Sequence, residues 1–178
     1  IRTGSGSLSS TFPLFLTNVN GTLFFIPRDN YFVDTATGNE YWASSELWKS
    51  DGTAEGTVVV KKNLWTGNHT PSPINLNGTL YLAAIGISNG TTQSTGTELW
   101  KSDGTEAGTV LVKDIHRWGD SSPERLTNVN GTLYFAANDG EHGKELWKSD
   151  GTETGTVLVK DIRTGSKGAY MRFQKQVN

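Results

Sequence analysis

A twelve-residue segment, Glu-Leu-Trp-Lys-Ser-Asp-Gly-Thr-x-x-Gly-Thr, occurs three times in this chain of 178 residues and constrains its fold more than any other feature. The copies occupy residues 46–57, 98–109 and 145–156, and they differ only at the two x positions. A second segment, Asn-Gly-Thr-Leu followed by an aromatic residue, precedes each copy. The Asp residues of successive copies are 52 and 47 residues apart, a period typical of stacked supersecondary units.

Each repeat is predicted to hold short strands joined by tight turns. The pair Asn130-Gly131 tolerates the positive φ angles of a primed hairpin turn, and Asp150-Gly151 opens a second turn. The predicted strands of the third repeat lie at 125–129, 132–137, 145–148 and 157–162, with counterparts at 80–84 and 110–112 in the second repeat and at 23–26 and 58–60 in the first. Helical periodicity is not found, so the fold is predicted to be all-β.

Four antiparallel strands in each repeat, with both faces apolar, are typical of the blades of a β-propeller. A β-sandwich is the alternative, but it does not account for the internal repetition. We therefore expect about three four-stranded blades, forming a partial propeller or one completed by an oligomer, since propellers usually hold 4–8 blades. The expected boundaries are 1–63 for blade 1, 64–114 for blade 2 and 115–161 for blade 3, with 162–178 starting a further unit or forming a tail.

The two ends of the chain match, since residues 1–5 and 162–166 both read Ile-Arg-Thr-Gly-Ser. We therefore expect the chain to begin within a repeat. An isolated arc of three blades would bare an apolar face at each end, together with a Trp of the repeat, and the residues expected there include Leu23, Phe25, Leu133 and Phe135. Because bare apolar faces destabilise and aggregate, we expect further blades or another copy of the chain to complete the ring.

The repeated segment resembles the bacterial ELWxxDGT repeat family. Ser121-Ser122-Pro123, residues 130–135 and residues 159–162 also match the usual pattern of that family. The resemblance covers nearly the whole chain and implies secreted or surface-attached propeller-like repeats, and so an extracellular or cell-surface location. The Ser-Asp-Gly-Thr turn is also similar to the Asp-box of sialidase-type propellers, except that two residues are inserted before Gly-Thr and no aromatic residue follows.

Composition narrows the range of partners and chemistries. The chain has 16 Lys and Arg against 18 Asp and Glu and lacks a basic tract, which argues against nucleic acid as a partner. The absence of cysteine excludes disulfides and thiolate metal sites. No apolar run reaches the roughly 20 residues that span a bilayer. Without a nucleophile motif, an arginine cluster or paired acids, the sequence predicts that the protein is not an enzyme.

Residues that recur in every repeat are predicted to be structural. Asp51, Asp103 and Asp150 are expected to close their own turns by accepting backbone hydrogen bonds. A calcium site is the alternative, but calcium loops gather several carboxylates and carbonyls at short spacing, so no cofactor is predicted. Two further sets recur: Trp48, Trp100 and Trp147, expected to wedge between blades, and Glu46, Glu98 and Glu145, expected to bind backbone or the turn.

The candidate ligand-binding residues lie off the repeat. The loops after the second and fourth strands of a blade share one face, and here they vary in length, as loops of a working face do. Their aromatic residues are predicted to bind ligand, namely Tyr31, Tyr41, Trp42, Trp65 and Trp118. Packing over blade edges is the alternative for the last two. All three histidines, His69, His116 and His142, also fall there, but their different offsets argue against a shared metal site.

These features predict a non-catalytic binding or structural module outside the cell that contacts glycans or proteins through its long-loop face. Two alternatives remain: a propeller-type glycosidase or lyase, and the structural subunit of an extracellular fibre. Five residues begin N-glycosylation sequons, namely Asn20, Asn68, Asn77, Asn89 and Asn130. Three of these are the repeated hairpin turn, which accounts for them without a sugar.

Overall fold

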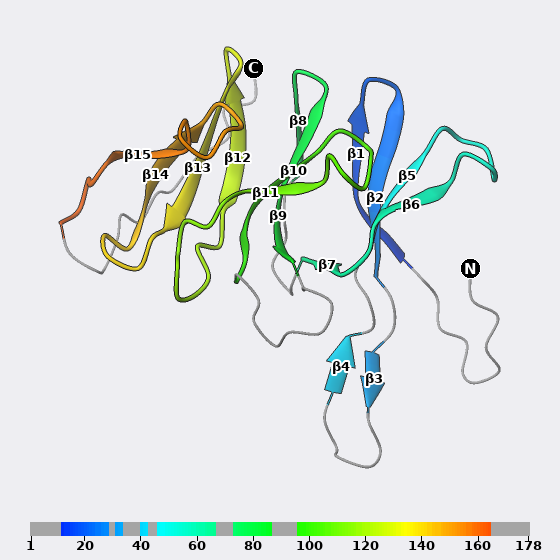
Figure 1. Ribbon diagram of the computed structural model, residues 1–178, viewed down its shortest axis with the longest axis horizontal. Coiled ribbons are helices and arrows are strands. Elements are labelled where there is room, and N and C mark those ends of the chain that lie inside the picture. Colours follow the sequence, from blue (N-terminus) through cyan, green and yellow to red (C-terminus); the bar gives the residue numbers. More distant parts are fainter. Residues whose placement is uncertain are drawn as a thin grey trace, which may run out of the picture.

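The computed structural model describes residues 12–28, 31–33, 40–42, 46–66, 73–86 and 96–164, and in these ranges every regular element is a β-strand (Figure 1). No helix capable of crossing a membrane occurs within them. The strands form three antiparallel sheets that lie side by side, together with one separate hairpin. The predicted all-β fold of antiparallel blades is confirmed, and the three sheets do not close into a ring.

The strand bounds are as follows. The first sheet contains β1 (Phe12–Val19), β2 (Thr22–Arg28), β5 (Leu47–Ser50) and β6 (Val58–Lys61). The second contains β7 (Leu64–Trp65), β8 (Ile74–Leu76), β9 (Thr79–Gly86), β10 (Glu98–Ser102) and β11 (Val110–Lys113). The third contains β12 (Glu124–Val129), β13 (Thr132–Asn138), β14 (Lys144–Ser149) and β15 (Val157–Lys160). The hairpin pairs β3 (Tyr31–Val33) with β4 (Glu40–Trp42).

The first and second strands of each sheet are joined by the repeated Asn-Gly turn. Both residues adopt positive φ, for example 51° at Asn130 and 85° at Gly131, as a type I′ turn requires. The Asn two residues earlier closes the turn, since Oδ1 of Asn128 accepts a hydrogen bond of 2.9 Å from the Gly131 N–H. Asn18 and Asn75 do the same in the other two sheets. Local side-chain chemistry therefore sets the register of each blade at this turn.

The second sheet is built differently along its first edge. In the first and third sheets a long strand, β1 or β12, runs along β2 or β13 with a register shift. In the second sheet β8 covers only the turn end of β9, and β7 pairs with the other end through Trp65 and Ile85. Trp65 was expected in a loop, and that placement is wrong. The shorter first strand of this repeat leaves part of the β9 edge unpaired, and β7 fills it.

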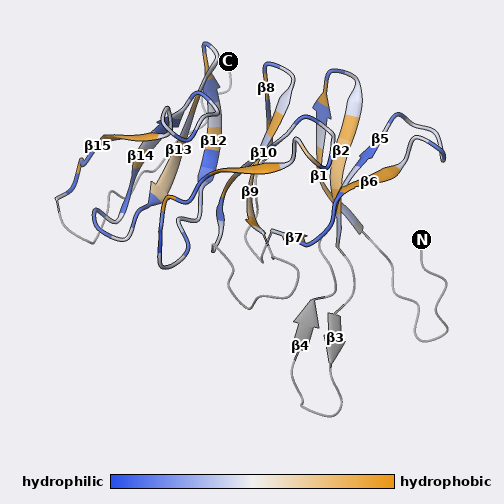
Figure 2. Cartoon of the chain, viewed as in Figure 1, coloured by the Kyte–Doolittle hydropathy of each residue, from blue (hydrophilic) through white to orange (hydrophobic). Residues whose placement is uncertain are grey.

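The core consists of two apolar clusters, one on each side of the second sheet. Figure 2 shows apolar residues along β2, β9 and β13. Leu80, Leu82 and Ala84 of β9 pack against the first sheet, whereas Tyr81 of β9 and Leu99 of β10 pack against the third. Alternating residues of one strand thus face opposite neighbours, and the middle sheet is covered on both faces.

The outward face of the third sheet differs from the one expected. Leu133 and Phe135 were assigned to a bare terminal face, but they are 0 % and 1 % exposed and belong to the cluster shared with the second sheet. The intervening residue Tyr134 is half-buried and lies on the outward side of β13. A shift of one residue reverses the face of a strand, and the direction of stacking between sheets decides which set is covered.

The Trp of each repeated segment faces the sheet that precedes its own in the chain, so only the Trp residues of the second and third sheets lie between two described sheets. Trp100 packs in the cluster of the first and second sheets, and Trp147 in that of the second and third. Trp48 lies on the outward face of the first sheet, where its ring is 6.2 Å from that of Phe25. The expectation that Trp residues wedge between blades therefore describes two of the three copies.

Candidate functional site

The candidate site is the segment between β11 and β12, residues 114–123, together with the loop between β13 and β14, residues 139–143. The β11–β12 segment follows the last strand of the second sheet, and the β13–β14 loop follows the second strand of the third sheet (Figure 1). Both therefore belong to the set of loops that was predicted to form the binding face. Both segments are fully described by the structure. The two segments lie against each other, since the His116 ring packs close to Gly140, and the Asn138 N–H at the end of β13 donates a hydrogen bond to the Ser121 carbonyl.

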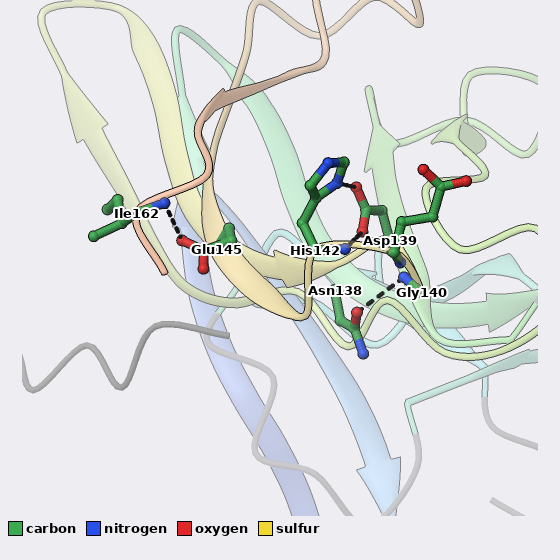
Figure 3. A network of polar contacts seen from close by, with 7 residues as sticks. Asn138, Asp139, Gly140, His142, Glu145 and Ile162 are labelled. Atoms are coloured by element: carbon green, nitrogen blue, oxygen red, sulfur yellow. Dashed lines mark hydrogen bonds and ion pairs between the residues drawn. The ribbon is translucent and has the colours of Figure 1, made fainter. Parts of the chain in front are cut away.

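Glu98 holds the β11–β12 segment in place through three hydrogen bonds. Its side chain is buried at the start of β10, and Oε2 accepts hydrogen bonds from the Ile115 N–H at 2.9 Å and the Ser121 hydroxyl at 2.6 Å. Oε1 accepts a third from the Ser121 N–H at 3.0 Å. Burial raises the pKa of this carboxyl to about 7 despite these bonds. The equivalent Glu145 accepts a hydrogen bond from the Ile162 N–H (Figure 3) and another from the Arg163 N–H.

The geometry around Ser121 accommodates both charge states of Glu98. The Ser121 hydroxyl lies 2.6 Å from Oε2 of Glu98 and 3.1 Å from the carbonyl oxygen of Thr97. A hydroxyl carries one hydrogen and serves one of these acceptors at a time. When Glu98 is protonated, its own O–H can donate to the Ser121 oxygen, and Ser121 is then free to donate to Thr97. Loss of the charge therefore leaves no buried acceptor or donor unpaired at this point.

Backbone bonds tie the segment to its neighbours on either side. The Ser122 N–H donates to the Thr97 carbonyl, and the Asn138 N–H donates to the Ser121 carbonyl, each at 2.9 Å. Asp120 accepts a hydrogen bond of 2.6 Å from the Thr97 N–H. The segment thus bridges the second and third sheets, and its ends are fixed by several hydrogen bonds rather than one.

Trp118 projects from the middle of this anchored segment. Its side chain is 85 % exposed, and the guanidinium carbon of Arg117 lies 5.0 Å from the centre of its ring. The turn that carries it is closed by a hydrogen bond of 3.0 Å from the Gly119 N–H to the His116 carbonyl. The His116 ring lies so close to Gly119 and Gly140 that a β-carbon at either would come within 3.0 Å of it. The Trp118 ring is therefore exposed to solvent on a turn whose backbone packs against the His116 ring.

The β13–β14 loop is organised by Asp139. One carboxylate oxygen accepts hydrogen bonds from the Glu141 N–H at 2.9 Å and the His142 N–H at 2.8 Å, and the other lies 2.7 Å from Nδ1 of His142 (Figure 3). Partial burial opposes ionisation of Asp139, but the bonds from His142 hold its pKa below the usual value. The hydrogen bond with Asp139 raises the pKa of His142 in return. This loop lies beside the Trp118 segment, since Gly140 packs against the His116 ring.

The remaining predicted ligand residues lie elsewhere. Tyr31 pairs with Trp42, and Tyr41 with Phe32, in the β3–β4 hairpin inserted between the second and third strands of the first sheet. Trp65 is half-buried in β7. The structure therefore pairs two of the predicted residues with each other, builds Trp65 into a sheet and leaves Trp118 outside the sheets. His69 lies outside the described residues, which contain no group of three or more His, Asp or Glu side chains suited to a metal ion.

The Asp residues of the repeated segment occupy turns with the same hydrogen bonds in every copy. Oδ1 of Asp103 accepts from the Thr105 N–H at 2.8 Å and from the Thr105 hydroxyl at 2.7 Å. The oxygen of that hydroxyl accepts from the Gly108 N–H at 2.9 Å. The same bonds recur at Asp51 with Thr53 and Gly56, and at Asp150 with Thr152 and Gly155. Hydrogen bonds from the neighbouring Thr lower the pKa of all three carboxyls.

Two functional features escaped the sequence analysis. Arg117 was not singled out, although it directly precedes Trp118 and places a cation over its ring. Ser121 was noted only as part of the Ser-Ser-Pro segment that matches the family pattern, whereas its hydroxyl and N–H both donate hydrogen bonds to Glu98. The only available signal was the Ser-Ser-Pro segment itself, because the two partners are separated by 23 residues.

Comparison with known proteins identifies no relative. No protein-family model matches the chain, and neither a curated protein nor a solved structure matches it significantly.

Proposed function

We propose that this protein is a non-catalytic, extracellular binding module that contacts glycans or proteins through its long-loop face. The observation that supports this most directly is Trp118, whose side chain is 85 % exposed on a segment that hydrogen bonds hold on either side, at Ile115 and at Ser121. Exposed aromatic rings supply large contact area at low entropic cost. The extracellular location rests on the resemblance to secreted or surface-attached repeats.

Arg117 narrows the chemistry of the ligand. A guanidinium held beside an aromatic ring offers a cation and an apolar face at one point. This combination suits a ligand that presents an apolar patch next to a carboxylate or sulfate, as acidic glycans and acidic protein loops do. The rigid anchoring of the segment limits the conformational entropy lost on binding.

The proposal is tested by screening the purified chain on a glycan array that includes acidic and neutral sugars. Trp118→Ala is expected to weaken binding about 5- to 150-fold if Trp118 is a hot spot, and Arg117→Ala to weaken binding to acidic sugars selectively. Leu16→Ala is the matched control, because Leu16 is 60 % exposed but lies on β1, away from these loops. Binding that survives Trp118→Ala at full strength would contradict the proposal.

An activity assay distinguishes the alternative, a propeller-type glycosidase or lyase, from a non-catalytic binding module. A panel of chromogenic glycosides and uronic-acid substrates detects either reaction directly. Turnover that is abolished by substitution of a carboxylate on the loop face would replace the binding proposal with the enzymatic one.

A further inference from the structure

The two interfaces between sheets repeat the same polar contact. Lys49 on β5 donates a hydrogen bond of 2.8 Å to the carbonyl oxygen of Gly104 in the turn of the second sheet. Lys101 on β10 donates one of 2.8 Å to the carbonyl oxygen of Gly151 in the turn of the third. The first and second sheets therefore each use the Lys of their repeated segment to bond the turn of the sheet that follows.

The same two Gly residues are covered by an aromatic side chain of the preceding sheet. A β-carbon at Gly104 would lie 3.1 Å from Cζ of Phe24, and one at Gly151 would lie 2.1 Å from the hydroxyl of Tyr81. Lys49 also interacts electrostatically with Asp103, and Lys101 with Asp150. The interface is thus a fixed combination of a Lys, an aromatic ring and a turn that carries an Asp.

The outward faces of the first and third sheets carry the two unmatched halves of this interface. On the third sheet, Lys148 is equivalent to Lys101, and Tyr134 is equivalent to Tyr81. Lys148 is exposed and has no hydrogen-bond or ion-pair partner among the described residues. On the first sheet, Gly52 is equivalent to Gly104 and Gly151, whose carbonyl oxygens accept the Lys hydrogen bonds. No described atom lies within 4 Å of a β-carbon built at Gly52. Trp48 and Phe25 stack on this outward face, and none of the other described sheets packs against them.

We propose that the third sheet of one copy of this chain docks on the first sheet of a second copy, with Lys148 bonding the Gly52 carbonyl and Tyr134 covering that turn. The docking reproduces both internal interfaces, in which a Trp of the later sheet is covered by the earlier one. The positive charge of Lys148 would then lie beside the negative charge of Asp51, as Lys49 lies beside Asp103.

Such a contact joins two different faces, so it closes only if the rotation between copies returns to the start. Two copies present six sheets, which is within the usual range of 4–8 blades for a propeller. In a closed pair each copy uses the outward faces of both its first and its third sheet, so that both faces are covered. This inference concerns the outward faces of the first and third sheets and does not depend on the ligand proposed for the loop face.

Sedimentation equilibrium of the purified chain at micromolar concentration tests the docking. The expected mass is about twice that of the 19.3 kDa chain. Trp48→Glu damages the first-sheet face and Lys148→Glu damages the third-sheet face, and each alone is expected to sediment as a monomer. Arg117→Glu makes the same charge change as Lys148→Glu on the loop face, and it is expected to leave the dimer intact.

Mixing the two variants distinguishes head-to-tail docking from other dimers. The intact third sheet of Trp48→Glu can still dock on the intact first sheet of Lys148→Glu, so an equimolar mixture is expected to recover a dimer. Far-UV circular dichroism shows whether each variant is folded. Because Lys148 is exposed, its variant keeps the test valid even if Trp48→Glu unfolds. A monomer for the unmodified chain, or a dimer that survives Lys148→Glu, would overturn the proposal.

Discussion

The Asp103 carboxylate lies against Gly108 so closely that a β-carbon at residue 108 would come within 2.1 Å of Oδ1. The same approach joins Asp51 to Gly56 and Asp150 to Gly155. Asp103 cannot simply move away, because Oδ1 already accepts two hydrogen bonds from Thr105. This contact accounts for the second Gly of the repeated segment, whereas the first, Gly104, is required by its φ of 89°.

The first prediction concerns this contact. Gly108→Ala is expected to lower the melting temperature by about 2–6 °C in a chain of this size, because the methyl group displaces Asp103 from Thr105. The measurement is thermal unfolding followed by circular dichroism. In an Asp103→Ala background the clash is absent, so Gly108→Ala should have a smaller effect there. Equal effects in the two backgrounds would show that the carboxylate is not the cause.

The second prediction concerns acid stability. The pKa values of Asp51, Asp103 and Asp150 are lowered in the folded protein from 3.8, so these groups add stability above that pH and lose it as the pH falls through their folded values. The triple Asp→Asn variant keeps an acceptor oxygen but no charge. Its deficit in melting temperature relative to the unmodified chain is therefore expected to be constant above about pH 5 and to shrink below about pH 4. A deficit that grows in acid would reverse the sign and contradict the prediction.

The third prediction concerns Glu98 and has the opposite sign. Its folded pKa of about 7 lies above the ordinary value of 4.5, so the folded state binds the proton more tightly than the unfolded state. Between those values the free energy of unfolding is expected to fall as pH rises, by at most roughly 1.4 kcal/mol per pH unit. Chemical denaturation at several pH values measures this slope, and Glu98→Gln should remove that contribution. Identical slopes for the two proteins would exclude Glu98 as the titrating group.

The fourth prediction separates core from surface tryptophans. Trp147 is 6 % exposed between the second and third sheets, so Trp147→Ala is expected to cost about 3–5 kcal/mol of unfolding free energy. Trp118 is 85 % exposed, and Trp118→Ala should change the unfolding free energy by no more than about 0.5 kcal/mol. Urea denaturation measures both. A large loss at Trp118 would place that ring in a packed environment and remove it from the binding face.

The sequence by itself determined the repeated turns and the strands that flank them, but not β3, β4 or β7. Residues 130–131 and the repeated segment close their turns with hydrogen bonds between residues two to seven positions apart, so local residue types are sufficient to predict them. The all-β fold and its antiparallel blades follow from the same local pattern.

Only the tertiary structure decided which side of each sheet is covered. Leu133 and Tyr134 are adjacent in the sequence, yet one is buried between sheets and the other faces outward. Glu98 reaches Ser121, 23 residues away, only because two sheets stack, and Trp65 joins a sheet because β8 is short. These contacts depend on how separate sheets pack against each other. The alternation of apolar residues along one strand does not show which sheet will lie next to it.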